Sequence, residues 1–194
     1  MNGLVLAGGK SSRLGQDKTA PDFQGQTLLQ RTATLLQRHC DHVFISTRTA
    51  DMAHCGFEII LDATERIGPL GGISTALSRI GGPLLVLACD LPFMDSATLQ
   101  KLIDFHASKP ASAVLTTFQQ AQTGFIESLV AIYEPDALAL LKQGIENKLY
   151  KLSRIIPEHR RHLLPYGQEL EHVFFNVNYP HDLERMRQQQ ALQT

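Results

Sequence analysis

Short apolar runs alternate along the chain with longer segments in which apolar residues recur at helical spacing. The short runs indicate strands, because glycine, proline or polar residues bound them. The longer segments indicate amphipathic helices, as with the paired leucines Leu28, Leu29, Leu35 and Leu36. Predicted strands cover residues 3–7, 42–46, 57–61, 83–90, 112–117, 128–133 and 173–178, and predicted helices cover 27–39, 73–80, 97–107, 135–143, 148–156 and 180–191.

This alternation predicts βαβ units and a mainly parallel sheet, that is, an α/β fold. The run PLLVLACD at 83–90 is typical of a central strand covered on both faces, and Ser96 is the predicted N-cap of the helix after it. Ligands of such sheets bind beyond the carboxyl ends of the strands. We therefore expect a cleft formed by the loops 8–18, 62–72 and 90–95.

Composition and charge narrow the class of protein. With 194 residues, 43% of them hydrophobic and 19% charged, the chain fits one globular domain, residues 1–194. Eighteen basic and 19 acidic residues give a net charge of −1, which argues against a nucleic-acid-binding surface. Three cysteines do not suggest a disulfide framework, and neither a signal peptide nor a membrane helix is apparent. We expect a soluble, cytoplasmic protein that binds neither nucleic acid nor a membrane.

The loop after the first predicted strand, LAGGKSSRLGQDK at 6–18, is the strongest candidate for phosphate binding. Its glycines let backbone N–H groups approach a phosphate, and its cations can neutralise phosphate charge. It matches neither the Walker pattern nor the dinucleotide pattern G-x-G-x-x-G. The alternative is a solvated turn. The residues concerned are Gly8, Gly9, Gly15, Lys10, Arg13 and Lys18.

Two carboxylates follow predicted strands and are candidates for ligand binding. Asp90 ends the run 83–90 and could hold Mg²⁺, which often binds through one carboxylate together with substrate phosphates. Asp62 follows the strand 57–61. The alternative for both is a carboxylate that caps a turn.

Other polar groups are interpreted as structural. One set of histidines and cysteines matches no standard zinc spacing, so no metal site is expected there. His106 is expected to pack against its own helix's neighbours, and the basic run 159–162 to form solvated surface. The set comprises His39, Cys40, His42, His54 and Cys55.

A family resemblance is carried by four motifs that follow one another along the chain. They are L-A-G-G-x-S-x-R-L-G-x-D-K at 6–18, G-P-L-G-G at 68–72, C-D-L-P at 89–92 and F-N-V-N-x-P-x-D-L at 175–183. The chain resembles the molybdenum cofactor guanylyltransferases, a branch of the nucleotidyltransferases. The resemblance implies a Rossmann-like three-layer fold and Mg²⁺-dependent transfer of GMP from GTP to a molybdopterin-type cofactor, with release of pyrophosphate. It implies GTP and molybdopterin as partners, and we expect a monomer that meets other proteins of cofactor biosynthesis.

The resemblance also implies roles for individual residues. Arg13, Lys18 and Asp90 would be catalytic, with Asp90 as the Mg²⁺ ligand. Asn176 and Asn178 would bind the acceptor; they flank Val177 and would face the same way in a strand, and amides suit the edge of a pterin. The alternative is that these amides only tie the loop to the backbone. The implied nucleotide-binding residues are Leu6, Ala7, Gly8, Gly9, Lys18, Asp62 and Asp90.

One position departs from the family pattern, because Ser46 stands where members can have an asparagine; this leaves part of base recognition open. Three alternatives to guanylyl transfer remain: a CTP:molybdopterin cytidylyltransferase, a sugar-1-phosphate nucleotidylyltransferase, and a catalytically silent nucleotide-binding module. The LAGG opening and Phe175-Asn-Val-Asn favour guanylyl transfer, and the presence of Arg13, Lys18 and Asp90 argues against a silent module.

Overall fold

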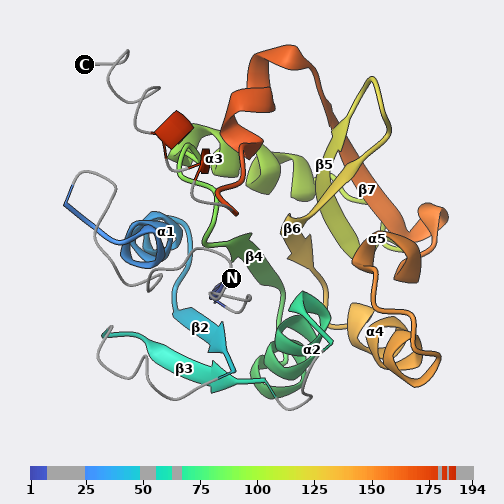
Figure 1. The fold of residues 1–194 in the computed structure, drawn as a ribbon. Helices are drawn as coiled ribbons and strands as arrows, with labels where there is room; N and C mark the ends of the chain where they lie inside the picture. The colour runs from blue at the N-terminus through green and yellow to red at the C-terminus, as the bar shows by residue number, and fades with distance from the viewer. Residues whose placement is uncertain (8–24, 49–55, 63–66, 179–180, 183, 187–194) are drawn as a thin grey trace.

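A seven-stranded sheet forms the centre of the molecule, with the strand order β3-β2-β1-β4-β6-β5-β7 (Figure 1). The computed structural model describes residues 1–7, 25–48, 56–62, 67–178, 181–182 and 184–186. Of these strands, β6 pairs antiparallel with β4 and β5, and the other pairings are parallel. This confirms the predicted α/β class with a mainly parallel sheet. The strands are β1 Asn2–Leu6, β2 Val43–Thr47, β3 Glu58–Leu61, β4 Leu84–Ala88, β5 Leu115–Gln120, β6 Ile126–Tyr133 and β7 Arg161–Tyr166.

Helices cover both faces of the sheet, with α1 and α3 on one face and α2 and α4 on the other (Figure 1). Successive side chains of a strand point to opposite faces, and the two cores follow that alternation. Val5 of β1 packs in one core with Leu29 of α1, and Leu4 packs in the other with Leu70 of α2. The three-layer arrangement is therefore confirmed. The helices are α1 Leu28–Gln37, α2 Pro69–Ile80, α3 Ser96–His106, α4 Ala137–Glu146 and α5 Leu152–Ile155, with 3₁₀ turns η3 Glu158–Arg160 and η4 Gln168–Phe174.

The central strand β4 is buried along its whole length, as its unbroken apolar run predicts. Leu85 and Leu87 face the core under α1 and α3, while Leu84 and Val86 face the core under α2 and α4. Full burial of each such side chain contributes about 1.5–3 kcal/mol. Burial on both faces fixes β4 in the middle of the sheet and carries Asp90 to the sheet's carboxyl edge.

Helices α2 and α3 begin differently from what the sequence predicts. The N-cap of α3 is Asp95 rather than Ser96, because Asp95 Oδ1 accepts a hydrogen bond of 2.7 Å from Thr98 N. The Ser96 hydroxyl lies 2.7 Å from His39 Nε2 instead. Helix α2 begins at Pro69, so the G-P-L-G-G run forms its first turn instead of preceding it. Proline suits this position, because a helix leaves its first N–H groups unpaired.

The largest differences between the predicted and the observed secondary structure lie in the last third of the chain. Residues 161–166 form the edge strand β7, although the run 159–162 was expected to be solvated surface. His162 stacks on Phe105 with ring centroids 3.8 Å apart, and Pro165 is tolerated because an edge strand has one unpaired side. The predicted strand 173–178 is wrong, since η4 ends at Phe174 and the residues after it join no strand ladder.

Two further predictions in this region are affected. The predicted helix 148–156 is confined to α5, with Lys148 before it in the left-handed region at φ 58°. The predicted helix 180–191 is helical where it is described, at 181–182 and 184–186, and otherwise lies outside the described residues. His106 packs as expected, with Nδ1 2.8 Å from Thr116 Oγ1. Within the described residues, no helix combines the length and apolar character needed to cross a membrane.

Candidate active site

The carboxyl ends of β1, β2, β3 and β4 meet at one edge of the sheet. Hydrogen bonds just beyond the strands hold this edge together: Ala7 N donates to Ser46 O at 2.9 Å, and Asp62 N donates to Thr47 O at 3.0 Å. The parallel register therefore brings together the predicted site residues Leu6, Ala7, Asp62 and Asp90. The predicted residues Gly8, Gly9, Arg13 and Lys18 lie outside the described part of the chain.

The Asp62 carboxylate is held by the strand beside it. Ser46, on β2, is 2% exposed, and its hydroxyl donates a hydrogen bond of 2.6 Å to Asp62 Oδ1. Burial raises the pKa of the Asp62 carboxyl, whereas the hydrogen bond from Ser46 and the charge of Arg48 lower it. Asp62 is thus an oriented acceptor for hydrogen bonds as well as the end of a strand.

Asp90 follows β4 in a loop that is fixed at both ends. Its backbone carbonyl accepts a hydrogen bond of 2.8 Å from Val177 N, and farther along the loop Met94 O accepts one of 2.9 Å from Arg31 Nη2 of α1. Asp90 itself is partly exposed. A hard carboxylate at a strand tip fits Mg²⁺, which takes one or two protein carboxylates and completes its shell with phosphates and water.

The described residues offer no larger metal site, because no three or more His, Cys, Asp or Glu side chains gather among them closely enough to hold an ion. His39, Cys40 and His42 fall within that search, whereas His54 and Cys55 lie outside the described residues.

Residues 176–178 lie against the Asp90 loop. Val177 is 2% exposed and packs with Met186, and against Leu28 of α1, Phe93 and Phe175. Asn176 and Asn178 on either side of it are exposed. The amides therefore alternate with a buried residue as predicted, although the segment is not a strand, and the backbone bond from Val177 sets them beside Asp90.

Three residues that were not among the predicted site residues support this edge. Asp182 Oδ2 accepts a hydrogen bond of 3.0 Å from Asn178 N, and Asp182 stands within the F-N-V-N-x-P-x-D-L motif, which was a usable signal. Gly72 lies inside the G-P-L-G-G motif and packs against Ser46. Ser46 itself was noticed only as a departure from the family.

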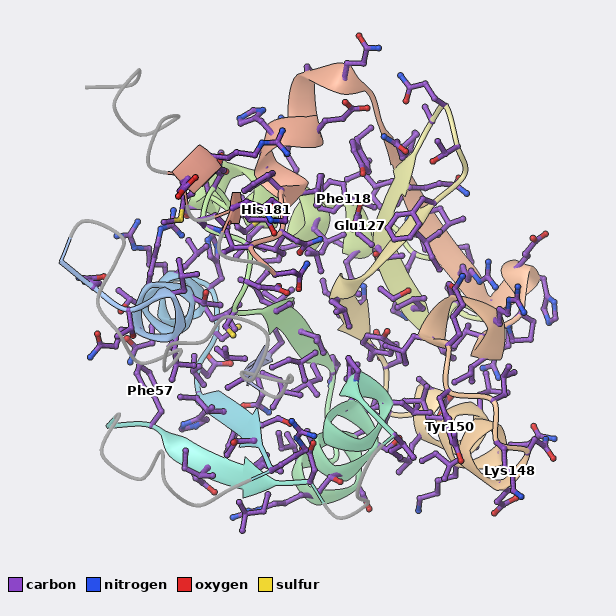
Figure 2. The ribbon with its side chains drawn as sticks, viewed as in Figure 1. Phe57, Phe118, Glu127, Lys148, Tyr150 and His181 are labelled. Carbon is purple, nitrogen blue, oxygen red and sulfur yellow. The ribbon has the colours of Figure 1, made fainter. Side chains whose placement is uncertain are left out.

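A further acid lies at the same edge. Glu127 is on β6, which runs antiparallel to β4 and therefore begins where β4 ends; it is labelled near Phe118 in Figure 2. Glu127 Oε1 accepts a hydrogen bond of 2.6 Å from the Tyr166 hydroxyl. Burial raises the pKa of Glu127, and the bond from Tyr166 lowers it. The hydrogen-bonded pair of Glu127 and Tyr166 thus lies on the side of this edge where antiparallel β6 follows β4 in the sheet.

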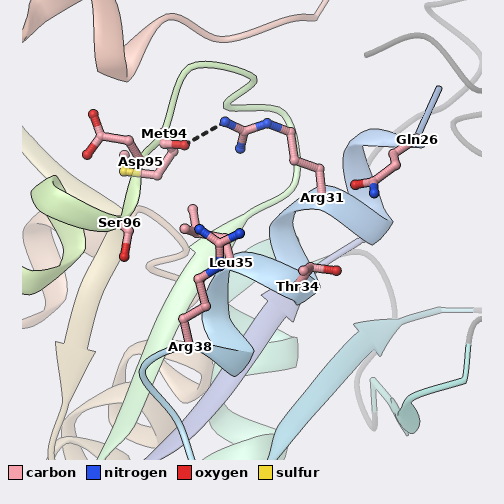
Figure 3. Close-up of a pocket in the computed structure, with 8 residues that line it drawn as sticks. All are labelled: Gln26, Arg31, Thr34, Leu35, Arg38, Met94, Asp95 and Ser96. Carbon is pink, nitrogen blue, oxygen red and sulfur yellow. Dashed lines mark hydrogen bonds between the residues drawn. The ribbon is translucent and has the colours of Figure 1, made fainter. Parts of the chain in front are cut away.

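A cavity of about 360 Å³ lies between α1 and the residues that lead into α3 (Figure 3). Arg31 and Arg38 of α1 line one side, and Met94, Asp95 and Ser96 line the other. Among the residues that the structure describes, no predicted site residue lines it. The cavity is separate from the edge of the sheet, but it shares with that edge the loop that carries Asp90.

A mainly parallel sheet whose first strand precedes a glycine-rich stretch of sequence, with carboxylates at the tips of two parallel strands, defines an α/β protein built to bind a nucleotide. The comparisons narrow this class. The chain belongs to the family described as the MobA-like NTP transferase domain, a family of nucleotidyltransferases, whose sequence profile matches residues 3–193.

Individual relatives are similar over most of the chain. A "Probable molybdenum cofactor guanylyltransferase" of Thermococcus sibiricus is 30% identical over 96% of this chain and 97% of its own length. A "Molybdenum cofactor biosynthesis bifunctional protein" of Synechocystis sp. is 39% identical over 73% of this chain, and the chain spans 41% of that longer relative. The crystal structure of molybdopterin-guanine dinucleotide biosynthesis protein A from Archaeoglobus fulgidus superposes with a TM-score of 0.75 at 25% identity, covering 95% of this chain and 96% of the other.

Proposed function

We propose that residues 1–194 form a single nucleotidyltransferase domain that transfers GMP from GTP to a molybdopterin-type molybdenum cofactor and releases pyrophosphate. One observation carries the proposal: Val177 N donates to Asp90 O at 2.8 Å. This contact sets the two exposed amides of 176–178 beside the carboxylate expected to face the triphosphate. A donor site and an acceptor site thus adjoin, as a transfer between two bound substrates requires. The printed names of the relatives from Thermococcus and Archaeoglobus support the same reaction.

The chemistry makes modest demands on the protein. An oxygen of the acceptor's phosphate attacks the α-phosphorus of GTP, the bond from that phosphorus to the bridging oxygen breaks, and pyrophosphate leaves with the electron pair. Such a transfer depends mainly on positioning and on charge neutralisation. No covalent intermediate with the enzyme is needed.

On the nucleotide side, the backbone of Leu6, Ala7, Gly8 and Gly9 approaches the nucleotide, and Arg13 and Lys18 balance the charge of the triphosphate. Asp62 accepts a hydrogen bond from the nucleoside. Asp90 would hold Mg²⁺, which would offset charge on the phosphates. The hydrogen bond from Val177 N to Asp90 O supports the position of that carboxylate.

On the acceptor side, Asn176 and Asn178 present amides that both donate and accept hydrogen bonds, which suits the mixed edge of a pterin. Burial of Val177 between them holds the segment against α1 and the Asp90 loop. The amides are therefore presented from a fixed backbone, although no strand ladder supports it.

The test is a turnover assay in which purified protein, Mg²⁺ and a molybdopterin acceptor are mixed with GTP, CTP, ATP or UTP. We expect pyrophosphate and a guanine dinucleotide product with GTP, and at least tenfold less product with the other three. Turnover with CTP instead would make the protein a cytidylyltransferase. Turnover only with a sugar-1-phosphate as acceptor would identify the sugar branch. Binding of GTP without turnover with any acceptor would indicate a silent module.

A further inference from the structure

Ser46 occupies a buried position from which its hydroxyl reaches a site carboxylate. It lies on β2 between β1 and β3, in register with Leu6 and Ile60. With 2% of the residue exposed, the hydroxyl has little access to a ligand, and it donates its proton to Asp62 Oδ1 at 2.6 Å. Whatever a longer side chain does at this position in relatives, this serine acts on its neighbouring carboxylate.

Gly72 supplies the space for this pair. A Cβ atom built on Gly72 would lie 2.1 Å from Ser46 Oγ and 3.0 Å from Asp62 Oδ1. Any side chain there would displace the serine hydroxyl, whose rotation breaks the bond to Asp62. Glycine is a poor residue for a helix compared with alanine, so the presence of Gly72 near the start of α2 is explained by what it packs against. The motif G-P-L-G-G thus contributes to the site through Gly72, which leaves room for the hydrogen bond between Ser46 and Asp62.

We propose that Ser46 is a positioning residue for nucleotide recognition: its hydroxyl fixes the rotamer of the Asp62 carboxylate, and Gly72 leaves the room this requires. The inference rests on the proposed function and deepens it at the nucleoside end. A carboxylate offers about four acceptor sites, and the bond from Ser46 occupies one of them. The group that Asp62 recognises is a hydrogen-bond donor of the nucleotide, either on the guanine base or on the ribose.

The hydrogen bond also favours the charged carboxylate. A donor to a carboxylate stabilises its ionised form, in opposition to the burial that raises the pKa of Asp62. Arg48 is the charged group among the described residues whose field acts on Asp62, and α2 places no charge against the carboxylate at Gly72. Removal of the Ser46 hydroxyl should therefore both loosen Asp62 and raise the pH at which it becomes protonated.

The first test compares Ser46→Ala with Ser74→Ala in the full chain. Ser74 is a matched control because its hydroxyl is buried on the same helix as Gly72 and has no hydrogen-bond partner among the described residues. Ser46→Ala should weaken GTP binding about tenfold, leave kcat nearly unchanged, and move the acid limb of kcat/KM to higher pH. Ser74→Ala should change none of the three.

A second, independent variant is Gly72→Ala, which should weaken GTP binding as Ser46→Ala does. Removal of the serine oxygen relieves the shortest contact and leaves those with Asp62 Oδ1 at 3.0 Å and Ser46 Cβ at 3.2 Å, which small shifts can accommodate. The double variant should therefore bind GTP only slightly worse than Ser46→Ala alone, a clear departure from additivity. Additive losses would overturn the proposal, since they would mean that the two residues act separately.

Nucleotide analogues then locate the donor. ITP lacks the 2-amino group of guanine, and 2′-deoxyGTP lacks one ribose hydroxyl. The analogue with which the Ser46→Ala penalty disappears identifies the group that Asp62 recognises; a penalty that persists with both assigns a donor that both retain, such as N1–H. If wild-type protein turns over GTP while Ser46→Ala matches Ser74→Ala in affinity and pH profile, the proposal is wrong and the proposed function stands. If wild-type protein does not bind GTP, both are wrong.

Discussion

Truncation of Val177 to alanine should separate acceptor binding from nucleotide binding. Val177 is 2% exposed and packs among Met186, Leu28, Phe93 and Phe175. The change removes two methyl groups, worth about 1.6 kcal/mol of transfer free energy at about 0.8 kcal/mol for each carbon. A residual cavity brings the total cost to about 2 kcal/mol. If the whole domain unfolds as one unit, the melting temperature falls by about 4–8 °C.

Truncation of Val177 should affect acceptor binding because Val177 holds the segment that carries the two asparagines. With the packing of Val177 reduced, the segment that carries Asn176 and Asn178 should open locally more often, because local opening depends on few contacts. We expect acceptor affinity to fall by about tenfold and GTP affinity to change by less than twofold. The assay is a pair of equilibrium titrations, one with the acceptor and one with GTP and Mg²⁺, alongside thermal unfolding.

Asn178→Ala is the matched control, because Asn178 is exposed. It should reduce acceptor affinity without lowering the melting temperature by more than a degree or two. The reasoning is refuted if Val177→Ala lowers the melting temperature but leaves acceptor affinity unchanged. It is also refuted if Asn178→Ala weakens GTP binding as much as acceptor binding, which would make the segment purely structural.

Three further predictions concern charge and capping. Lys18→Ala deletes a cation of the phosphate loop and should weaken GTP binding about 10- to 150-fold in a titration, the effect of losing about 1.5–3 kcal/mol; wild-type affinity would remove Lys18 from the site. Burial raises the pKa of Glu127 in the folded protein, so the stability it contributes is present in acid and is lost as the pH rises through that raised value. Glu127→Gln should therefore raise the melting temperature above that of wild type at pH 8, with a smaller difference at pH 4, and an equal difference at both would contradict the assignment. Asp95→Ala removes the cap of α3 and should cost about 1 kcal/mol in chemical denaturation, whereas Ser96→Ala, at the residue first expected to be the cap, should cost less.

Periodicity predicted the central strand β4 better than the edge strand β7. The run Leu84–Ala88 is recognisable because both of its faces are buried, so no polar residue interrupts it. Edge strand β7 contains Arg161, His162 and Pro165, which resemble surface residues. Their strand conformation depends on pairing with β5 and on the stacking of His162 against Phe105, and both are contacts between segments distant in sequence.

The segment 173–178 shows how a correct pattern can predict the wrong element. Exposed Asn176 and Asn178 alternate with buried Val177, as they would in a strand. Alternation reports only that one side of an extended chain is buried. Here the backbone partner of Val177 is the loop carbonyl of Asp90 instead of a neighbouring strand. Its side-chain orientation was therefore predictable, but its secondary structure was not.

The candidate site was likewise predictable in part. Parallel strands place Asp62 and Asp90 at one edge whatever the strand order, so their approach follows from the α/β pattern alone. The hydrogen bond from Ser46 to Asp62 needs β2 and β3 to be neighbours in a particular register. The role of Gly72 needs, in addition, the distance at which α2 packs on those strands. Neither the register between β2 and β3 nor the packing distance of α2 is encoded in a local stretch of sequence.

The central claim, that this chain transfers GMP to a molybdopterin acceptor, is tested most directly with GTP labelled at its α-phosphate. The measurement is the transfer of that label to the acceptor by the wild-type protein and by Asp90→Asn. The substitution keeps the size of the side chain and its capacity to cap a turn, but removes the charge that would hold Mg²⁺. We predict transfer by the wild type and a rate lower by about 10²–10³ in the variant, with its melting temperature unchanged. Absence of transfer by the wild type, or activity of Asp90→Asn within about threefold of wild type at saturating Mg²⁺, would contradict the claim.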